Sequence, residues 1–207
     1  MMGSSASKAR QKNVLSCNQG SWKLNDCHEN HLPWYGNFVW RSDDRMRLRG
    51  LPGEQSDIAS MRMKFDYVDR ASHSFGGVPR VVFTEIVEPV EAGGAKVTPV
   101  PVMHGEEPVY GFLVEADAKR LAYIPDCSGI SPESFQTLER LDVMILDGLR
   151  MEKHATHFSI EECVENLQRI GAKRSFLTHL THHSDHDVLQ AELPAGIEVP
   201  WDGLTVS

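Results

Sequence analysis

The pattern of apolar and polar positions changes at about residue 55. Residues 1–54 are polar, rich in Asn, Ser and Arg, and follow neither a helical nor a strand period. We interpret them as a leader of undefined structure, and we expect residues 55–207 to form one domain. Ser56 is a candidate N-cap for a helix whose apolar residues recur near helical spacing as far as Val68.

Strand-like segments follow this helix. Residues 80–89 form an apolar run that is typical of a strand, and residues 96–103 alternate in part. The two prolines of the second run predict an edge position or a strand end, because proline cannot donate to a sheet ladder. Residues 109–116 and 120–126 surround a polar turn and predict a β-hairpin.

Helices and strands alternate from residue 131 onward. Ser131 and Pro132 fit the N-cap and first turn of a helix. The apolar run at 142–148 is typical of a buried strand, and further strand and helix segments follow from residue 173. This order predicts an α/β fold in which helices cover one face of a sheet.

The clearest local signal is a helix that begins at Ser159. Ser159 and Glu162 have the spacing of a capping box, in which each side chain bonds to the backbone of the other residue. The apolar residues that follow have helical spacing and predict the buried face: they are Ile160, Cys163, Val164 and Leu167. Gly171 is the expected C-terminal stop.

Composition favours one globular domain. The chain has 207 residues, of which 41% are apolar and 8% aromatic, enough for one packed core. No apolar run reaches the roughly 18 residues of a membrane span, and the first residues lack the apolar stretch of a secretory signal. The four cysteines have no C-x-x-C spacing. We therefore expect a cytoplasmic protein without disulfides or membrane association.

Charge is unevenly distributed along the chain. The formal net charge is −8, and residues 1–50 hold eight Lys/Arg against four Asp/Glu. The first fifty residues therefore carry +4 and the remainder −12. This acidic body makes nucleic acid an unlikely partner. We expect instead a small phosphorylated substrate that is held at a local site.

The candidate chemistry lies in four short strings, each just after a predicted strand. The strings contain His104, Asp126, His154 with His157, and His179 with the two histidines that follow. Ligand sites in α/β sheets are usually built at strand ends, and imidazole and carboxylate are common ligands of zinc. Taken singly, each residue fits a structural role as well, for example a turn at Asp126. The stretch 182–186 fits the solvated start of a helix.

The order of these strings resembles a known family. The segments VTPVPVMHG, YGFLVEADAKRLAYIPDCSGIS, LDVMILDGLRMEKHATHFSIEE and IGAKRSFLTHLTHH are similar to those of the PhnP-like phosphoribosyl cyclic-phosphate phosphodiesterases. These enzymes are relatives of the tRNA 3′-processing endonucleases (RNase Z). The resemblance covers about residues 56–207 and implies a metallo-β-lactamase fold, an αββα sandwich of α/β class.

The resemblance also implies roles for four residues. His104 and His179 resemble metal ligands of the two-metal site, and Asp126 resembles the carboxylate that bridges the two ions and serves the catalytic centre. His157 resembles the catalytic histidine that contacts the phosphate and protonates the leaving oxygen. The implied cofactor is zinc or manganese, and the implied activity is hydrolysis of a cyclic phosphate or a related small phosphodiester.

One family motif is missing from this chain. The string H-x-H-x-D-H, which supplies the remaining ligands, does not occur; the nearest candidates are His28 with His31 and the segment 181–186. We therefore expect the N-terminal part of the fold to be incomplete and at most one metal ion to bind. The alternative function is a non-catalytic remnant of the fold. A homodimer is a further expectation, because an incomplete sandwich exposes a sheet edge and an apolar face.

Overall fold

The structure is a computed structural model. It describes residues 13–18, 21–26, 38–42, 45–50, 57–64, 66, 80–85 and 88–206. Within these ranges, no helix has both the length and the apolar character that a membrane crossing requires.

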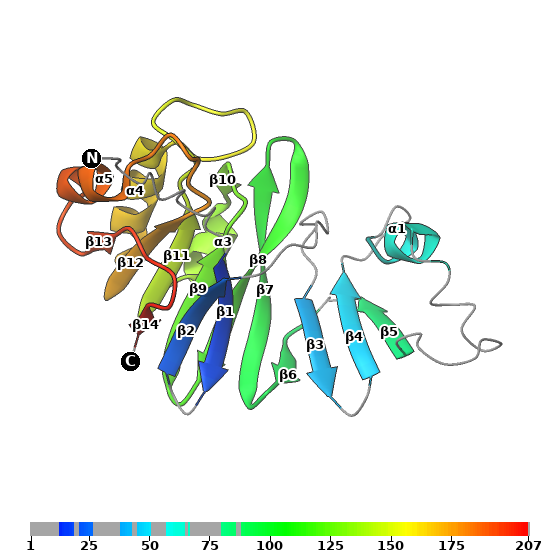
Figure 1. The fold of residues 1–207 in the computed structure, drawn as a ribbon. Helices are drawn as coiled ribbons and strands as arrows, with labels where there is room; N and C mark the ends of the chain where they lie inside the picture. The colour runs from blue at the N-terminus through cyan, green and yellow to red at the C-terminus, as the bar shows by residue number, and fades with distance from the viewer. Residues whose placement is uncertain are drawn as a thin grey trace, which may run out of the picture.

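A mixed sheet of eight strands forms the centre of the fold (Figure 1). In spatial order, the strands are β10 (Gly129–Ile130), β7 (Ala95–His104), β8 (Glu107–Ala116), β9 (Lys119–Ile124), β11 (Val143–Asp147), β12 (Arg174–Thr178) and β13 (Ile197–Glu198). The short strand β6 (Val90–Ala92) pairs with β7. Strands β7, β8 and β9 are antiparallel neighbours, whereas β9, β11, β12 and β13 run parallel.

Two smaller sheets use the N-terminal part of the chain. In the first, β1 (Asn13–Asn18) pairs with β2 (Ser21–Asp26), and β2 pairs with β14 (Thr205–Val206) near the C-terminus. In the second, β3 (Phe38–Ser42) pairs with β4 (Arg45–Gly50), and β4 pairs in parallel with β5 (Arg80–Glu85). The absence of a periodic pattern before residue 55 therefore did not predict these four strands.

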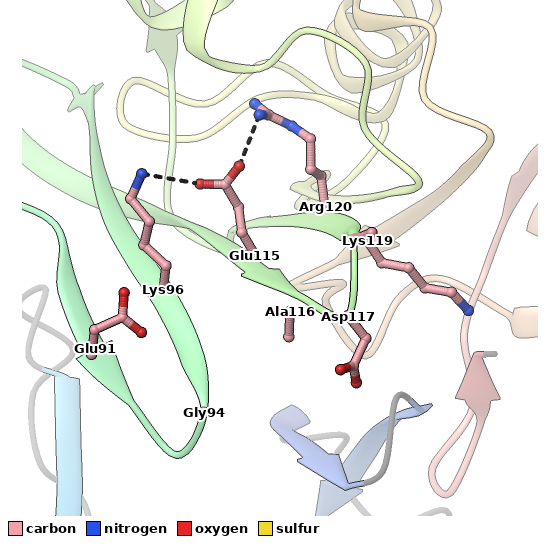
Figure 2. Close-up of a pocket in the computed structure, with 9 residues that line it drawn as sticks. Glu91, Gly94, Lys96, Glu115, Ala116, Asp117, Lys119 and Arg120 are labelled. Atoms are coloured by element: carbon pink, nitrogen blue, oxygen red, sulfur yellow. Dashed lines mark hydrogen bonds and ion pairs between the residues drawn. The ribbon is translucent and has the colours of Figure 1, made fainter.

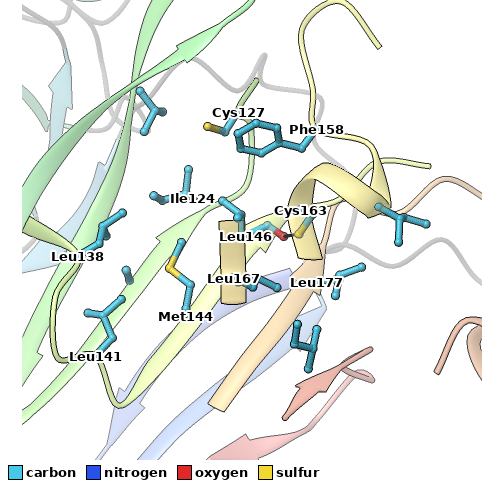
Figure 3. Close-up of a cluster of buried hydrophobic side chains, with 14 of the residues drawn as sticks. Ile124, Cys127, Leu138, Leu141, Met144, Leu146, Phe158, Cys163, Leu167 and Leu177 are labelled. Carbon is cyan, nitrogen blue, oxygen red and sulfur yellow. Dashed lines mark hydrogen bonds between the residues drawn. The ribbon is translucent and has the colours of Figure 1, made fainter. Parts of the chain in front are cut away.

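Three helices lie on one face of the main sheet: α3 (Pro132–Thr137), α4 (Ile160–Ile170) and α5 (His186–Glu192). Helix α1 (Asp57–Lys64) lies apart from them, next to β4 and β5, and agrees with the helix expected after Ser56. Leu146 of β11 packs in the core between sheet and helices with Cys163 and Leu167 of α4 (Figure 3). The opposite face of the sheet packs against Leu204 and Val206, and so against the sheet that contains β14.

Helix α4 confirms the predicted capping box. Ser159 Oγ accepts the backbone N–H of Glu162 at 3.2 Å, and the Glu162 carboxylate accepts the Ser159 N–H at 2.9 Å. Gly171 ends the helix with a left-handed φ of 65°. Cys163 is fully buried, and burial raises the pKa of its thiol well above the ordinary value. We therefore expect this thiol to be unreactive in the native protein.

Strand β7 lies inside the sheet rather than at its edge, contrary to the expectation from its prolines. It pairs with β8 over its whole length, and its other side pairs with β6 up to Val97 and with β10 from Val102. Pro99 and Pro101 fall in the gap between these two short strands. The prolines therefore stand where β7 has no described neighbour on one side, which explains why they are tolerated.

Candidate metal centre

Four strand ends meet at one edge of the main sheet. His104 ends β7, Asp126 follows β9 by two residues, Asp147 ends β11, and His179 comes directly after β12. Strands β9, β11 and β12 are parallel, and β7 has the same direction as β9 because both are antiparallel to β8. The carboxyl ends of all four strands therefore point to one edge, which is where α/β sheets usually bind ligands.

His157 reaches this edge from the loop between β11 and α4. The backbone N–H of Phe158 donates to the Cys127 carbonyl at 2.8 Å, and the Phe158 carbonyl accepts the Leu149 N–H at 3.0 Å. The first bond attaches the loop to the segment that carries Asp126, and the second connects the beginning of the loop to its end. The backbone next to His157 is therefore held by two hydrogen bonds of Phe158.

The four residues singled out from the sequence lie together. His104 Nε2 is 3.2 Å from His157 Nε2, and the ring centroids of His157 and His179 are 4.8 Å apart in a stacked arrangement. His179 Nε2 is 3.4 Å from Asp126 Oδ1. The ring of the exposed His154 lies 5.1 Å from that of His157. The site thus has an inner group of four residues and one outer histidine.

Asp147 is a site residue that the sequence reasoning missed. Its Oδ2 accepts hydrogen bonds from His157 Nδ1 at 2.7 Å and from the Cys127 N–H at 2.9 Å, and its side chain is fully buried. Burial raises the pKa of the Asp147 carboxyl, although both hydrogen bonds act in the opposite direction. A signal was present in the sequence, because Asp147 is the single charged residue of an otherwise apolar strand.

Asp147 also affects the pKa of the His157 imidazole. Burial acts to lower the pKa of the imidazole, but the hydrogen bond and charge of Asp147, together with the charge of Asp126, outweigh it and raise the pKa above its ordinary value. Because Nδ1 bonds to the carboxylate, the ring directs Nε2 toward His104. His157 therefore holds its proton to higher pH than an isolated histidine does.

His179 has a backbone conformation that is unusual for its residue type. Its φ is 63°, in the left-handed region that non-glycine residues rarely occupy. Strained residues of this kind cluster at functional sites, where the surrounding structure holds them. The conformation occurs at the turn that leaves β12, next to Asp126.

The donor atoms present fit a divalent transition-metal ion. One ligand atom from each of His104, Asp126 and His157 lies within 4.8 Å of the other two. Two imidazole nitrogens bound to one tetrahedral zinc lie about 3.3 Å apart, close to the 3.2 Å between the two Nε2 atoms here. The carboxylate on His157 Nδ1 is also a common partner of metal-bound histidine. The geometry therefore adds His157 to the candidate ligands, while the individual roles of His157 and His179 remain predictions.

Cys127 contributes no ligand to this centre. Burial raises the pKa of its thiol to about 12, because a thiolate is poorly solvated there. Metal binding and nucleophilic attack both require the thiolate. The thiol instead donates to the Gly129 carbonyl at 3.4 Å and packs in the hydrophobic core.

The remaining histidines near the C-terminus contact groups outside the candidate metal centre. The exposed His182 and His183 contact each other with ring centroids 3.9 Å apart. Asp185 is the N-cap of α5, and His186 Nε2 lies 3.1 Å from the Val199 carbonyl. This segment is therefore the solvated helix start that the sequence left open. The upstream candidates His28 and His31 lie outside the described residues.

A separate open hollow of about 420 Å³ lies at the opposite end of the sheet (Figure 2). Turn residues line it, and three of its charged side chains pair with one another: Lys96, Glu115 and Arg120. Glu115 lies 2.9 Å from Arg120 and 3.7 Å from Lys96. Arg120 also donates to the Thr137 carbonyl at 3.0 Å. This hollow contains none of the candidate metal ligands.

The fold and the histidine-aspartate centre together define a class of metal-binding α/β proteins, and the comparison with protein families agrees. A family model described as a beta-lactamase superfamily domain matches residues 48–180, which is more than half of the chain. The chain therefore belongs to the metallo-β-lactamase superfamily, and the fold expected from the resemblance is confirmed.

Two solved structures are similar to the chain. A crystal structure of a diphosphatase from the PhnP family is 30% identical, with a TM-score of 0.67, and the match covers 78% of this chain and 58% of that one. The short form of human tRNase Z is 13% identical over 84% of this chain and 92% of its own, with a TM-score of 0.50, and supports the fold alone. The expected membership of the metallo-β-lactamase superfamily is confirmed, and the chain is similar to a PhnP-family diphosphatase over 78% of its length.

A curated relative has a different name. It is the octanoyltransferase of Porphyromonas gingivalis, 30% identical over 155 residues, which is 73% of this chain and 30% of that protein. This chain thus spans less than a third of the octanoyltransferase and less than two thirds of the diphosphatase. Most of the octanoyltransferase lies outside the segment that aligns with this chain.

Proposed function

We propose that this protein is a metal-dependent hydrolase of small phosphodiesters. The observation that carries the proposal is the convergence of four residues at one sheet edge: His104, Asp126, His157 and His179. Donor atoms of His104, Asp126 and His157 lie close enough together to hold a divalent ion, and His179 lies next to Asp126. The 30% identity to a PhnP-family diphosphatase supports phosphoester chemistry in particular.

In this proposal, three side chains hold zinc or manganese: His104, Asp126 and His179. They come from three different strand ends, so the main sheet fixes their spacing. An ion at this position would polarise a phosphoryl oxygen and neutralise the negative charge that develops on it. The acidic chain needs such a local cation in order to accept an anionic substrate.

His157 supplies the proton in the proposed reaction. Asp147 Oδ2 accepts a hydrogen bond from Nδ1–H, which orients the ring, and the raised pKa favours a second proton on Nε2 compared with an ordinary histidine. From Nε2 this proton can pass to the oxygen of the departing alcohol. General acid catalysis of this kind contributes about 10²–10⁴ in rate.

The proposed partner is a small phosphorylated molecule. The body of the chain is acidic, which disfavours the long polyanionic backbone of a nucleic acid. We also propose a cytoplasmic location and a second copy of the chain as a binding partner. Size-exclusion chromatography with light scattering tests the second copy directly.

A second function is favoured by one specific observation. The sequence has no H-x-H-x-D-H string, and the described part of the chain contains a single group suited to a metal ion. Retention of two ions is difficult with this ligand set. The second candidate is therefore a metal-binding protein of the same fold that does not turn over substrate.

The experiment combines metal analysis with a hydrolysis assay. The purified 207-residue chain is loaded with Zn²⁺ or Mn²⁺, dialysed, and measured by elemental analysis and with bis-p-nitrophenyl phosphate. We expect at most one ion per chain and slow, metal-dependent hydrolysis. One bound ion without turnover would favour the second function, and no bound ion would refute both.

Two matched variants separate the proposed roles. His179→Gln should lower metal affinity, because it removes a proposed ligand. His157→Gln should keep the metal and lose hydrolysis, because it removes the proposed proton donor. The opposite pattern would show that His157 is the ligand, as its spacing to His104 also permits.

A further inference from the structure

Gly105 lies where three loops of the site meet. It follows His104 in the turn between β7 and β8, and its φ is 67°. Its N–H donates to Ser128 Oγ at 2.8 Å. A Cβ placed on Gly105 would lie 2.9 Å from Thr156 Cγ2, closer than such atoms normally approach. The position therefore requires glycine for both its backbone angle and its missing side chain.

The contact with Ser128 attaches the loop that carries Asp126. Ser128 donates its N–H to the Met103 carbonyl at 2.7 Å, and its Oγ lies 3.2 Å from the same oxygen. The hydroxyl can thus accept from Gly105 and donate to Met103. These bonds hold the Asp126 loop to the residues on both sides of His104.

The contact with Thr156 attaches the loop that carries His157. Thr156 precedes His157, and its N–H and Oγ1 lie 3.3 and 3.2 Å from His154 Nδ1. The loop is therefore locally ordered at the point where it touches Gly105. A displacement of Thr156 would be passed directly to the His157 backbone.

We propose that Gly105 is a positioning residue that sets the spacing between the His104 and His157 rings. The absence of a Cβ lets the His157 loop approach the β7–β8 turn, which brings the two Nε2 atoms to 3.2 Å. The structural part of this inference is independent of the activity. Only its effect on catalysis rests on the proposed function.

The chain offers variants that separate the steric effect from the backbone effect. Gly93 has a φ of 61° and nothing within 4 Å of an added Cβ, so Gly93→Ala imposes the left-handed strain without a contact. Thr156→Ser removes Cγ2 and keeps the hydroxyl. In Gly105→Ala combined with Thr156→Ser, the nearest remaining neighbours of the new Cβ are the Ala155 carbonyl at 3.6 Å and the residue 156 Cβ at 3.7 Å, which are ordinary contacts.

The test is ¹⁵N–¹H NMR of the imidazoles in the full chain, with and without Zn²⁺, together with hydrolysis kinetics. Gly105→Ala should shift the His157 ring nitrogens while those of His186 stay unchanged. It should also lower kcat about a hundredfold, as expected for a misplacement of roughly 1 Å, and change KM little. Thr156→Ser in the same chain should restore the His157 signals and most of kcat.

Three outcomes decide the inference. Recovery in the double variant, with Gly93→Ala like the parent chain, supports it. A double variant no closer to the parent than Gly105→Ala, or unchanged His157 signals in Gly105→Ala, overturns it. If Gly105→Ala alone does not fold, the double variant with Thr156→Ser decides: His157 signals like those of the parent chain support the inference, and shifted signals or a chain that still does not fold overturn it. A parent chain without turnover refutes the proposed function alone, because the NMR comparison still applies.

Discussion

The two ends of the main sheet both carry clusters of polar side chains, but the clusters differ in how completely their polar atoms are paired with one another. At the end with the hollow, Glu115 lies between Lys96 and Arg120 and pairs with both. Opposite charges thus meet within the protein, and Arg120 Nε is the one buried polar atom of this hollow without a hydrogen bond in the described part of the chain.

At the other end, two imidazole nitrogens face each other beside the carboxylates of Asp126 and Asp147. The Nε2 atoms of His104 and His157 are 3.2 Å apart, although a neutral ring offers only one N–H for its two nitrogens. Asp147 Oδ1 is buried without a hydrogen-bond partner among the described residues. A cation would balance these lone pairs and negative charges. The comparison teaches that unbalanced donor atoms, rather than the size of a hollow, indicate a site.

The largest expected effect is on metal affinity at the histidine end. Asp126→Ala should weaken Zn²⁺ binding by more than about a hundredfold, since even the loss of an outer-sphere partner costs about 10–100-fold. Asp117→Ala in the turn at the opposite end is the matched control and should leave affinity unchanged. Isothermal titration calorimetry measures both. Equal affinities in the two variants would remove the distinction between the two ends.

A smaller effect is expected on the titration of His157. Asp147→Asn removes the carboxylate that raises the pKa of this imidazole, so the pKa should fall. A proton donor must be protonated in order to act. As the pH rises, hydrolysis by the variant should therefore begin to fall at a lower pH than hydrolysis by the parent chain. NMR titration of the metal-free protein measures the pKa, and the rate profile checks the sign. Asp142→Asn, which affects a carboxylate paired with Lys173, is the control. An unchanged pKa of His157 would contradict the proposed role of Asp147.

The smallest effects concern stability. Ser159→Ala removes the cap of α4 at the site end and should lower the free energy of unfolding by about 1 kcal/mol. Glu115→Gln at the opposite end removes two part-exposed ion pairs, with Lys96 and Arg120, and should cost about 1 kcal/mol or less. Urea unfolding measures both values. A larger loss for Glu115→Gln would mean that the charged hollow contributes more to stability than a surface ion pair does.

The sequence by itself determined the features that depend on local physics. The capping box at Ser159, the buried run of β11 and the hairpin of β8 and β9 agree with the structure, because capping, periodicity and turn chemistry act over a few residues. It also determined that His104, Asp126 and His179 follow strand ends. The resemblance to PhnP-like enzymes supplied the fold, which periodicity alone left as a general α/β class.

Only the tertiary structure decided which side chains meet. Asp147 was part of the predicted strand at 142–148, and its bond to His157 exists because the loop between β11 and α4 returns to the end of β11. The place of β7 inside the sheet and the pairing of β2 with β14 depend on segments far apart in the sequence. The close approach of Thr156 to Gly105 belongs to the same class. Long-range contacts of this kind leave no periodic signal, because periodicity records which face of an element is buried and not which partner covers it.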